Sequence, residues 1–159
     1  MQVDVVEGSD VDVADDDELA PRGPIRVAMK GGDLRAGQRR EALGGAYFLL
    51  TFRHGETARE ARPGQFVMIK AGVSAEPPLR RPFSILSVDE GRESFTLFVK
   101  AVGQGSRALC AMAPGDVALC LGPLGRPFTP PPSGVAALMV AGGYGVAPFR
   151  FLGEELRDA

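Results

Sequence analysis

The chain has 159 residues, a formal net charge of −2 and a hydrophobic content of 45%, values that are ordinary for one globular domain with at most a fragment of a second. No apolar run reaches the roughly 18 residues of a membrane span, and no basic stretch followed by an apolar one marks a secretory signal. The two cysteines, Cys110 and Cys120, fit neither a disulfide framework nor a metal-ligand set. These features exclude a membrane and a metal-binding class, and we expect a cytoplasmic protein.

The charge is distributed unevenly along the chain. Residues 1–20 contain eight acidic residues and no Lys or Arg, which leaves 18 basic and 12 acidic residues elsewhere, a surplus of about +6. We predict that residues 1–24 form an acidic, disordered tail. The alternatives are that this tail folds back onto the basic body or docks on a partner. The basic surplus is scattered, so we predict no nucleic-acid partner.

Short apolar runs separated by turn residues predict a small antiparallel β-barrel within residues 25–133. Residues 25–45 are weakly patterned, with Gly-Gly pairs at both ends. A short helix is predicted between Gly105 and Met112, with Ser106 as a suitable N-cap, and His54 is expected to be a surface turn residue. The predicted strands are 46–53, 65–71, 83–88, 94–102 and 116–122.

The last part of the chain, residues 134–159, has the pattern of a different kind of domain. A Pro-rich linker at 125–134 precedes a continuous apolar run at 135–141, which predicts a strand buried on both faces. A glycine loop and a helix at 147–157 follow. We therefore predict the first strand, loop and helix of an α/β nucleotide-binding domain, which is incomplete because such a domain needs about 80–100 further residues.

The segment Arg81-Pro82-Phe83-Ser84 combines a cation, a flat ring and a hydroxyl. The arginine can donate two N–H groups to a pyrophosphate, and the phenyl ring can lie against a flavin ring while the serine bonds a ring nitrogen. Pro82 fixes one φ angle between them. The alternative interpretation is a surface arginine, a core phenylalanine and an exposed serine. This segment predicts a ligand that carries both phosphate and a redox-active ring.

Two glycine motifs stand downstream, at 103–106 and at 142–148. Backbone N–H groups at a helix start attract phosphate, and glycines allow close approach, so Gly105 and Ser106 predict a diphosphate contact. An ordinary glycine turn is the alternative, and Ser106 can cap the helix, bind phosphate or do both. The second motif lacks the third glycine of G-x-G-x-x-G, because Pro148 stands at that position.

Taken with the segments 63–71, 80–85, 97–109, 122–128 and 138–156, these motifs make residues 44–159 resemble the ferredoxin reductase-like flavoproteins. Within that family the resemblance is strongest to the electron-transfer subunit of NAD-linked dihydroorotate dehydrogenase. It implies a mainly β fold, in which a six-stranded antiparallel Greek-key FAD-binding barrel precedes the incomplete α/β domain. It also implies FAD as cofactor.

The resemblance implies a role for individual residues as well. Arg81 would contact the pyrophosphate, Phe83 would pack near the flavin ring, and Ser84 would lie near the reactive ring nitrogen as the catalytic contact. Residues 99–101 would lie along the adenosine or ribityl portion, and the second glycine loop would face nicotinamide nucleotide in complete relatives. The implied cofactor-binding residues are Arg81, Pro82, Phe83, Ser84, Val99, Lys100, Ala101, Gly105, Ser106, Gly142, Gly143 and Gly145.

The implied activity is electron transfer through FAD, between NAD and a catalytic dihydroorotate dehydrogenase subunit, in pyrimidine biosynthesis. Relatives form a heterotetramer with that subunit and carry a [2Fe–2S] cluster, whose cysteines are absent here. We therefore expect a truncated member without full NAD(P)H activity of its own. Two alternatives remain: an electron-transfer subunit of a ferredoxin:NADP oxidoreductase or hydrogenase, and a flavin-binding remnant without turnover.

Overall fold

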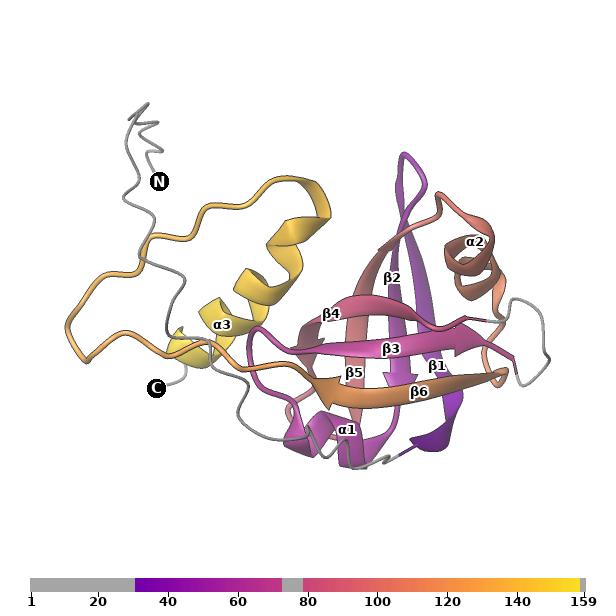
Figure 1. The fold of residues 1–159 in the computed structure, drawn as a ribbon, viewed down its shortest axis with the longest axis horizontal. Helices are drawn as coiled ribbons and strands as arrows, with labels where there is room; N and C mark the ends of the chain where they lie inside the picture. The colour runs from indigo at the N-terminus through magenta and orange to yellow at the C-terminus, as the bar shows by residue number, and fades with distance from the viewer. Residues whose placement is uncertain (1–30, 73–78, 158–159) are drawn as a thin grey trace, which may run out of the picture.

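The computed structural model describes residues 31–72 and 79–157, which form a barrel with helices packed around it (Figure 1). The predicted acidic tail, residues 1–24, lies outside the described residues. The strands are β1 (Gly31–Gly44), β2 (Tyr47–Arg53), β3 (Phe66–Ala71), β4 (Arg81–Val88), β5 (Ser94–Lys100) and β6 (Val117–Leu124). The helices are α1 (Gly55–Glu60), α2 (Gln104–Ala111), the 3₁₀ helix η2 (Gly143–Val146) and α3 (Ala147–Arg157).

The described strands close into one barrel with the order β1-β2-β5-β4-β3-β6, and each pair is antiparallel. Strands β3, β4 and β5 are consecutive neighbours, and β6 returns to lie beside β3. That order is the Greek-key arrangement. The predicted mainly β fold with a Greek-key barrel is therefore confirmed.

Strand β5 shows how the sequence builds both the core and the outer surface of the barrel. Its side chains alternate, so that Phe95, Leu97 and Val99 are fully buried while the residues between them are partly exposed. Successive side chains of a strand point to opposite faces, which gives β5 one apolar face and one accessible face. The accessible face carries Phe98 and Lys100.

Two elements formed where the sequence pattern gave no clear signal. Strand β1 occupies much of the weakly patterned region and pairs with both β2 and β6, so its neighbours supply its backbone hydrogen bonds. Helix α1 is capped by His54, whose Nδ1 accepts a hydrogen bond from the Thr57 N–H at 3.2 Å. His54 is thus a half-buried helix cap instead of the expected surface turn residue.

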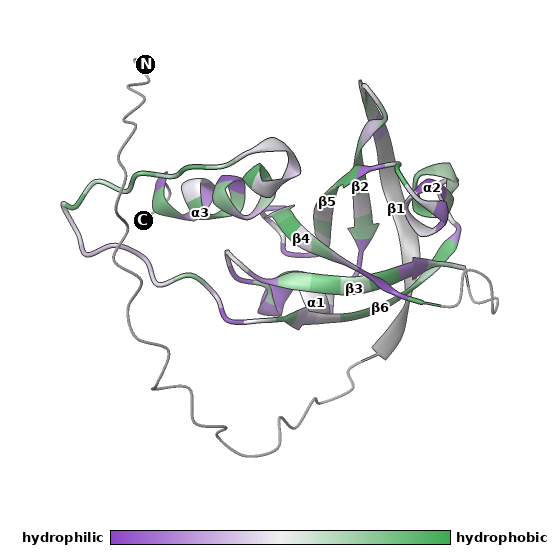
Figure 2. Ribbon diagram, turned by 45° about the horizontal axis from the view of Figure 1, so that its top comes forward, coloured by the Kyte–Doolittle hydropathy of each residue, from purple (hydrophilic) through white to green (hydrophobic). Residues whose placement is uncertain are grey.

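The apolar run at 135–141 does not form the predicted strand. It is largely exposed, with Leu138 at 91% and Val140 at 77% of full exposure. A strand of a parallel sheet needs neighbours on both edges and layers on both faces, and the described residues provide none for this run. The predicted helix at 147–157 is present as α3, which carries both hydrophobic and hydrophilic residues (Figure 2).

The turn between β4 and β5 is held by the carboxylate of Asp89. Its Oδ1 accepts hydrogen bonds from the backbone N–H groups of Glu93 at 2.9 Å and Ser94 at 2.6 Å. Desolvation raises the pKa of this carboxyl, but the hydrogen bonds from Ser94 and Glu93 together outweigh it and leave the pKa lowered. The ionised form of Asp89 therefore stabilises the folded turn.

We expect this contribution to depend on pH. Because the folded-state pKa lies below the unfolded value, the stabilisation is fully present above about pH 4 and is lost as the pH falls through the folded-state pKa. Asp89→Asn should therefore lower the free energy of unfolding at pH 7, and its difference from the unsubstituted chain should shrink toward pH 3. Urea unfolding at both pH values measures this, and a difference that stays constant would contradict it.

Candidate functional site

A cavity of about 290 Å³ lies at the start of α2, and we call it the α2 cavity. Four elements surround it: the start of β4, the accessible face of β5, the N-terminus of α2, and η2, which comes from much later in the chain. It therefore unites parts of the three sequence motifs. Its lining residues are Arg81, Phe83, Phe98, Lys100, Val102, Gly103, Gln104, Gly105, Ser106 and Tyr144.

The charged residues that line the α2 cavity are both cations, Arg81 and Lys100. The Arg81 guanidinium donates hydrogen bonds to the backbone carbonyls of Leu79 at 3.1 Å and Arg80 at 3.4 Å, and no carboxylate of the described residues pairs with it. The Lys100 ammonium lies 4.8 Å from the centre of the Tyr47 ring, a cation–π contact that holds it in place. Two cations without a lining carboxylate make the cavity attractive to an anion.

The N-terminus of α2 adds backbone donors to the same cavity. The N–H groups of Gln104 and Gly105 have no acceptor within the helix, and the described part of the chain places no other acceptor on them. A Cβ built on Gly103 would meet no atom within 4 Å, whereas one on Gly105 would lie 3.4 Å from Arg81 Cγ. The glycines thus leave the helix start open and let the Arg81 stem lie against it, which suits a phosphate group.

The Ser106 hydroxyl makes hydrogen bonds within the loop before α2. Its Oγ accepts hydrogen bonds from the N–H groups of Val102 and Gly103, both at 3.0 Å, and donates to the Gly103 carbonyl at 3.1 Å. The side chain is buried, and its one proton is already engaged. The N-cap residue of α2 is Gly103 and Ser106 stands at N3, so the predicted N-cap role of Ser106 is wrong. Its hydroxyl instead accepts a hydrogen bond from the backbone N–H of the N-cap residue.

Three aromatic rings stand beside the cations. Phe83 packs against the barrel core, and Phe98 stacks on Tyr47 with ring centres 5.3 Å apart. Tyr144 enters from η2 and is 61% exposed. Flat apolar rings next to cations and helix N–H groups can bind a ligand that joins a planar ring to phosphate.

The structure brings some of the predicted site residues to the α2 cavity and leaves others outside it. Arg81 and Phe83 share one face of β4, so Pro82 and Ser84 lie on the other, where Ser84 stands opposite Phe66 of β3. The Val99 side chain is buried in the core. The lining residues include Arg81, Phe83, Lys100, Gly105 and Ser106, and exclude Pro82, Ser84, Val99, Ala101, Gly142, Gly143 and Gly145.

Sequence reasoning missed two aromatic residues of the cavity. Phe98 stands two positions before Lys100, so the period of two along β5 was enough to place both on one face. Tyr144 lies inside the second glycine motif, but nothing in the sequence brought that loop close to β5. Val102, Gly103 and Gln104 complete the lining from the first glycine motif.

The cysteines do not fit an iron–sulfur cluster. Both are buried, Cys110 on α2 and Cys120 on β6, and burial raises the pKa of the Cys120 thiol to about 12. A [2Fe–2S] cluster needs four ligands, usually thiolates, and the sequence holds two cysteines. Among the described residues no group of three or more His, Cys, Asp or Glu side chains could hold a metal ion. Within residues 31–72 and 79–157, no helix has the length and apolar content needed to cross a bilayer.

Comparison with known proteins agrees with this geometry. Residues 42–128 match the oxidoreductase FAD-binding domain family. Two curated relatives are the electron transfer subunits of dihydroorotate dehydrogenase B (NAD(+)) from Desulforamulus reducens and Lysinibacillus sphaericus. They are 41% and 40% identical over 111 and 105 residues, which cover 70% and 65% of this chain. The chain belongs to the oxidoreductase FAD-binding domain family. It spans 42% and 41% of the lengths of these two relatives.

Solved structures share the fold. The NADH-dependent reduced ferredoxin-NADP oxidoreductase is 29% identical with a TM-score of 0.55, covering 64% of this chain and 36% of that one. A ferredoxin reductase in carbazole 1,9a-dioxygenase has a TM-score of 0.68 at 21% identity, covering 82% of this chain and 39% of that one. The second match extends beyond the barrel, and at that identity it shows the fold alone.

Proposed function

We propose that the α2 cavity binds FAD, with the diphosphate held by Arg81, Lys100 and the N–H groups at the start of α2. The observation that carries this proposal is the donor set, since both charged lining residues are cations and stand beside open helix N–H groups. Arg81 would supply two forked hydrogen bonds, and Lys100 a point charge. The glycines at 103 and 105 leave room for phosphate oxygens to approach the backbone.

The aromatic residues would hold the planar parts of the ligand. Phe83 shares the face of β4 with Arg81 and would pack near the flavin ring. Ser84, the next residue along β4, would donate a hydrogen bond to a nitrogen of the flavin ring. The backbone of Val99 and Ala101 would lie along the ribose or ribityl portion of FAD. Bound FAD would supply the redox chemistry, while these residues orient it and exclude water.

We propose that this barrel is the FAD-binding part of an electron-transfer subunit like those relatives. It would pass electrons between NAD and a dihydroorotate dehydrogenase catalytic subunit, in pyrimidine biosynthesis. Support comes from the 41% identity to the Desulforamulus reducens electron transfer subunit. Residues 134–157, with the glycines at 142, 143 and 145, would correspond to the beginning of a nicotinamide nucleotide-binding domain.

A second candidate function is electron transfer in a ferredoxin:NADP oxidoreductase, favoured by the 29% identity to the NADH-dependent reduced ferredoxin-NADP oxidoreductase. The two candidates differ in the partner that reduces or oxidises the flavin. Mixing the flavin-loaded protein with a dihydroorotate dehydrogenase catalytic subunit and dihydroorotate, or with reduced ferredoxin, separates them. Flavin bleaching in the first mixture alone supports the dihydroorotate pathway.

The first measurement for FAD binding is the visible spectrum of the purified chain, with the released cofactor identified by chromatography. We expect a yellow protein that releases FAD in about one equivalent, because a diphosphate with two planar ends matches the donors and rings of the α2 cavity. A colourless chain that also fails to take up added FAD would overturn the proposal.

A further inference from the structure

Contacts of different kinds attach helix α3 to the barrel. Phe151 is buried in the barrel core at 2% exposure, and Phe149 stacks on Phe128 with ring centres 5.5 Å apart. The third contact is an ion pair between Arg92 Nη2 and Glu155 Oε1 at 3.1 Å. The first two are apolar packing contacts, and the ion pair adds a directional polar link between the helix and the β4–β5 turn.

Arg92 is placed to make this contact by several hydrogen bonds. It lies in the turn between β4 and β5 with φ at +49°, a left-handed conformation that a non-glycine residue adopts only when its surroundings hold it there. Its Nη1 donates to the carbonyls of Ala58 at 3.3 Å, Arg59 at 3.4 Å and Ala61 at 3.1 Å. One guanidinium therefore joins the end of α1, the β4–β5 turn and α3.

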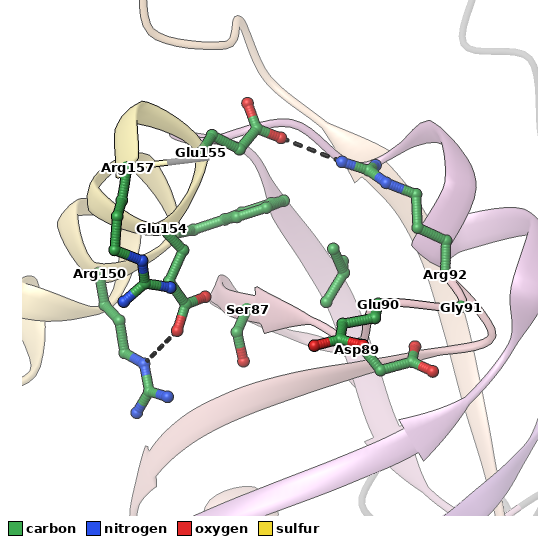
Figure 3. A pocket seen from close by; sticks show the side chains of 11 residues that line it. Ser87, Asp89, Glu90, Gly91, Arg92, Arg150, Glu154, Glu155 and Arg157 are labelled. Atoms are coloured by element: carbon green, nitrogen blue, oxygen red, sulfur yellow. Dashed lines mark hydrogen bonds and ion pairs between the residues drawn. The ribbon is translucent and has the colours of Figure 1, made fainter. Parts of the chain in front are cut away.

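A second cavity separates α3 from the β4–β5 turn around this ion pair. It has a volume of about 850 Å³ and is lined by both elements; we call it the α3 cavity (Figure 3). The figure shows Glu155 facing Arg92 from the opposite element, whereas Glu154 pairs with Arg150 on the helix itself. The Arg92–Glu155 pair thus links α3 to the barrel, whereas the Arg150–Glu154 pair lies within the helix.

The position of α3 also determines the position of Tyr144. Helix η2 runs directly into α3 at Ala147, which is buried, so a movement of α3 carries η2 with it. Tyr144 of η2 lines the α2 cavity while more than half of its surface remains exposed, so few contacts of its own hold it there. The link between α3 and the barrel thus reaches the proposed FAD site through η2.

We propose that Arg92 and Glu155 are positioning residues, which lock α3 against the barrel and thereby hold Tyr144 against the ligand in the α2 cavity. This inference rests on the proposed binding of FAD. Neither residue lines the α2 cavity, so their influence on the ligand passes through α3 and η2.

The test is a double-mutant cycle on the full chain, in which the FAD Kd is measured for Glu155→Ala and Tyr144→Ala singly and together. Glu155→Ala is expected to weaken FAD binding about two- to fivefold when Tyr144 is present, the scale of a partly exposed ion pair, and to have no effect when Tyr144 is alanine. Equal weakening in both backgrounds would overturn the proposal, because independent sites add.

Glu154→Ala is the matched control, since it removes an ion pair from the same helix without breaking a link to the barrel. It should leave the FAD Kd unchanged in both backgrounds. Glu155→Gln keeps an acceptor oxygen for Arg92 and should restore part of the affinity lost in Glu155→Ala. If the glutamine variant binds FAD no better than the alanine variant, the hydrogen bond between Arg92 and residue 155 is not what positions α3.

Amide hydrogen exchange of the chain without FAD separates this inference from the proposed function. Glu155→Ala should speed exchange in residues 143–157 relative to Glu154→Ala, while β2 and β5 exchange at unchanged rates. A chain that binds no FAD but shows this difference would refute the proposed function alone. Equal exchange in the two variants would overturn the positioning role.

Discussion

Replacing Arg81 with alanine is expected to weaken FAD binding by about ten- to a hundredfold. Hydrogen bonds from a charged donor contribute about 1.5–3 kcal/mol, and each 1.4 kcal/mol is about tenfold in affinity. Arg81 is exposed and donates within the described residues to backbone carbonyls alone, so its removal should leave the free energy of unfolding nearly unchanged. Flavin fluorescence titration measures the Kd, and urea unfolding measures the stability.

The neighbouring arginine provides the matched control for this experiment. Arg80 is also exposed and carries the same charge, but it does not line the α2 cavity. Arg80→Ala should therefore raise the FAD Kd only by the small amount expected when a distant positive charge is removed. Arg81→Lys keeps the positive charge but loses the forked pair of N–H donors, so its FAD Kd should lie between those of Arg80→Ala and Arg81→Ala. If Arg80→Ala and Arg81→Ala weaken binding equally, the effect is general electrostatic attraction and the assigned contact is wrong.

Replacing Phe151 with alanine is expected to lower the free energy of unfolding by about 3–5 kcal/mol, the range for truncating a buried phenylalanine. Phe151 belongs to the barrel core although it comes from α3, so the substitution leaves a void between the two. Urea unfolding followed by circular dichroism measures the loss. Phe151→Leu fills most of the void and should therefore recover part of the lost free energy of unfolding.

The same substitution distinguishes two ways in which α3 can be attached. If α3 unfolds together with the barrel, the midpoint falls while the dependence on urea is unchanged. If α3 detaches first, amide exchange speeds up in residues 147–157 while the barrel strands keep their protection. Phe149 is a half-buried ring stacked on Phe128, so Phe149→Ala should lower the free energy of unfolding less than Phe151→Ala does. An unchanged free energy of unfolding in Phe151→Ala would show that α3 contributes nothing to the core.

The barrel could be predicted from sequence because its signals are local. Alternation along β5 and the glycine turns mark strands within a few residues, and five strands fall close to their predicted bounds. Strand β1 was missed because its sequence has no strand pattern of its own. It forms by pairing with β2 and β6, and β6 comes from much later in the chain. The run at 135–141 has the composition of a buried strand, but composition does not provide the neighbours that a strand needs.

The candidate site was predictable to the extent that its residues lie in motifs. Arg81, Phe83 and Lys100 were predicted and meet at one cavity, because the faces of β4 and β5 follow from alternation. The position of Tyr144 and the hydrogen bonds of Ser106 to the loop before α2 depend on how the loops fold in space, and residue type alone could not decide them. Whether Ser84, Val99 and Ala101 contact a ligand stays a prediction.

The loop before α2 satisfies its own hydrogen bonds through the Ser106 hydroxyl, which binds Val102 and Gly103 at once. Such a loop has its shape before any ligand arrives, so little conformational entropy is lost when an anion enters. The encounter rate, set by diffusion and by the positive charge of the cavity, should therefore limit association. Raising the salt concentration would slow the arrival of the ligand while barely changing how fast it leaves.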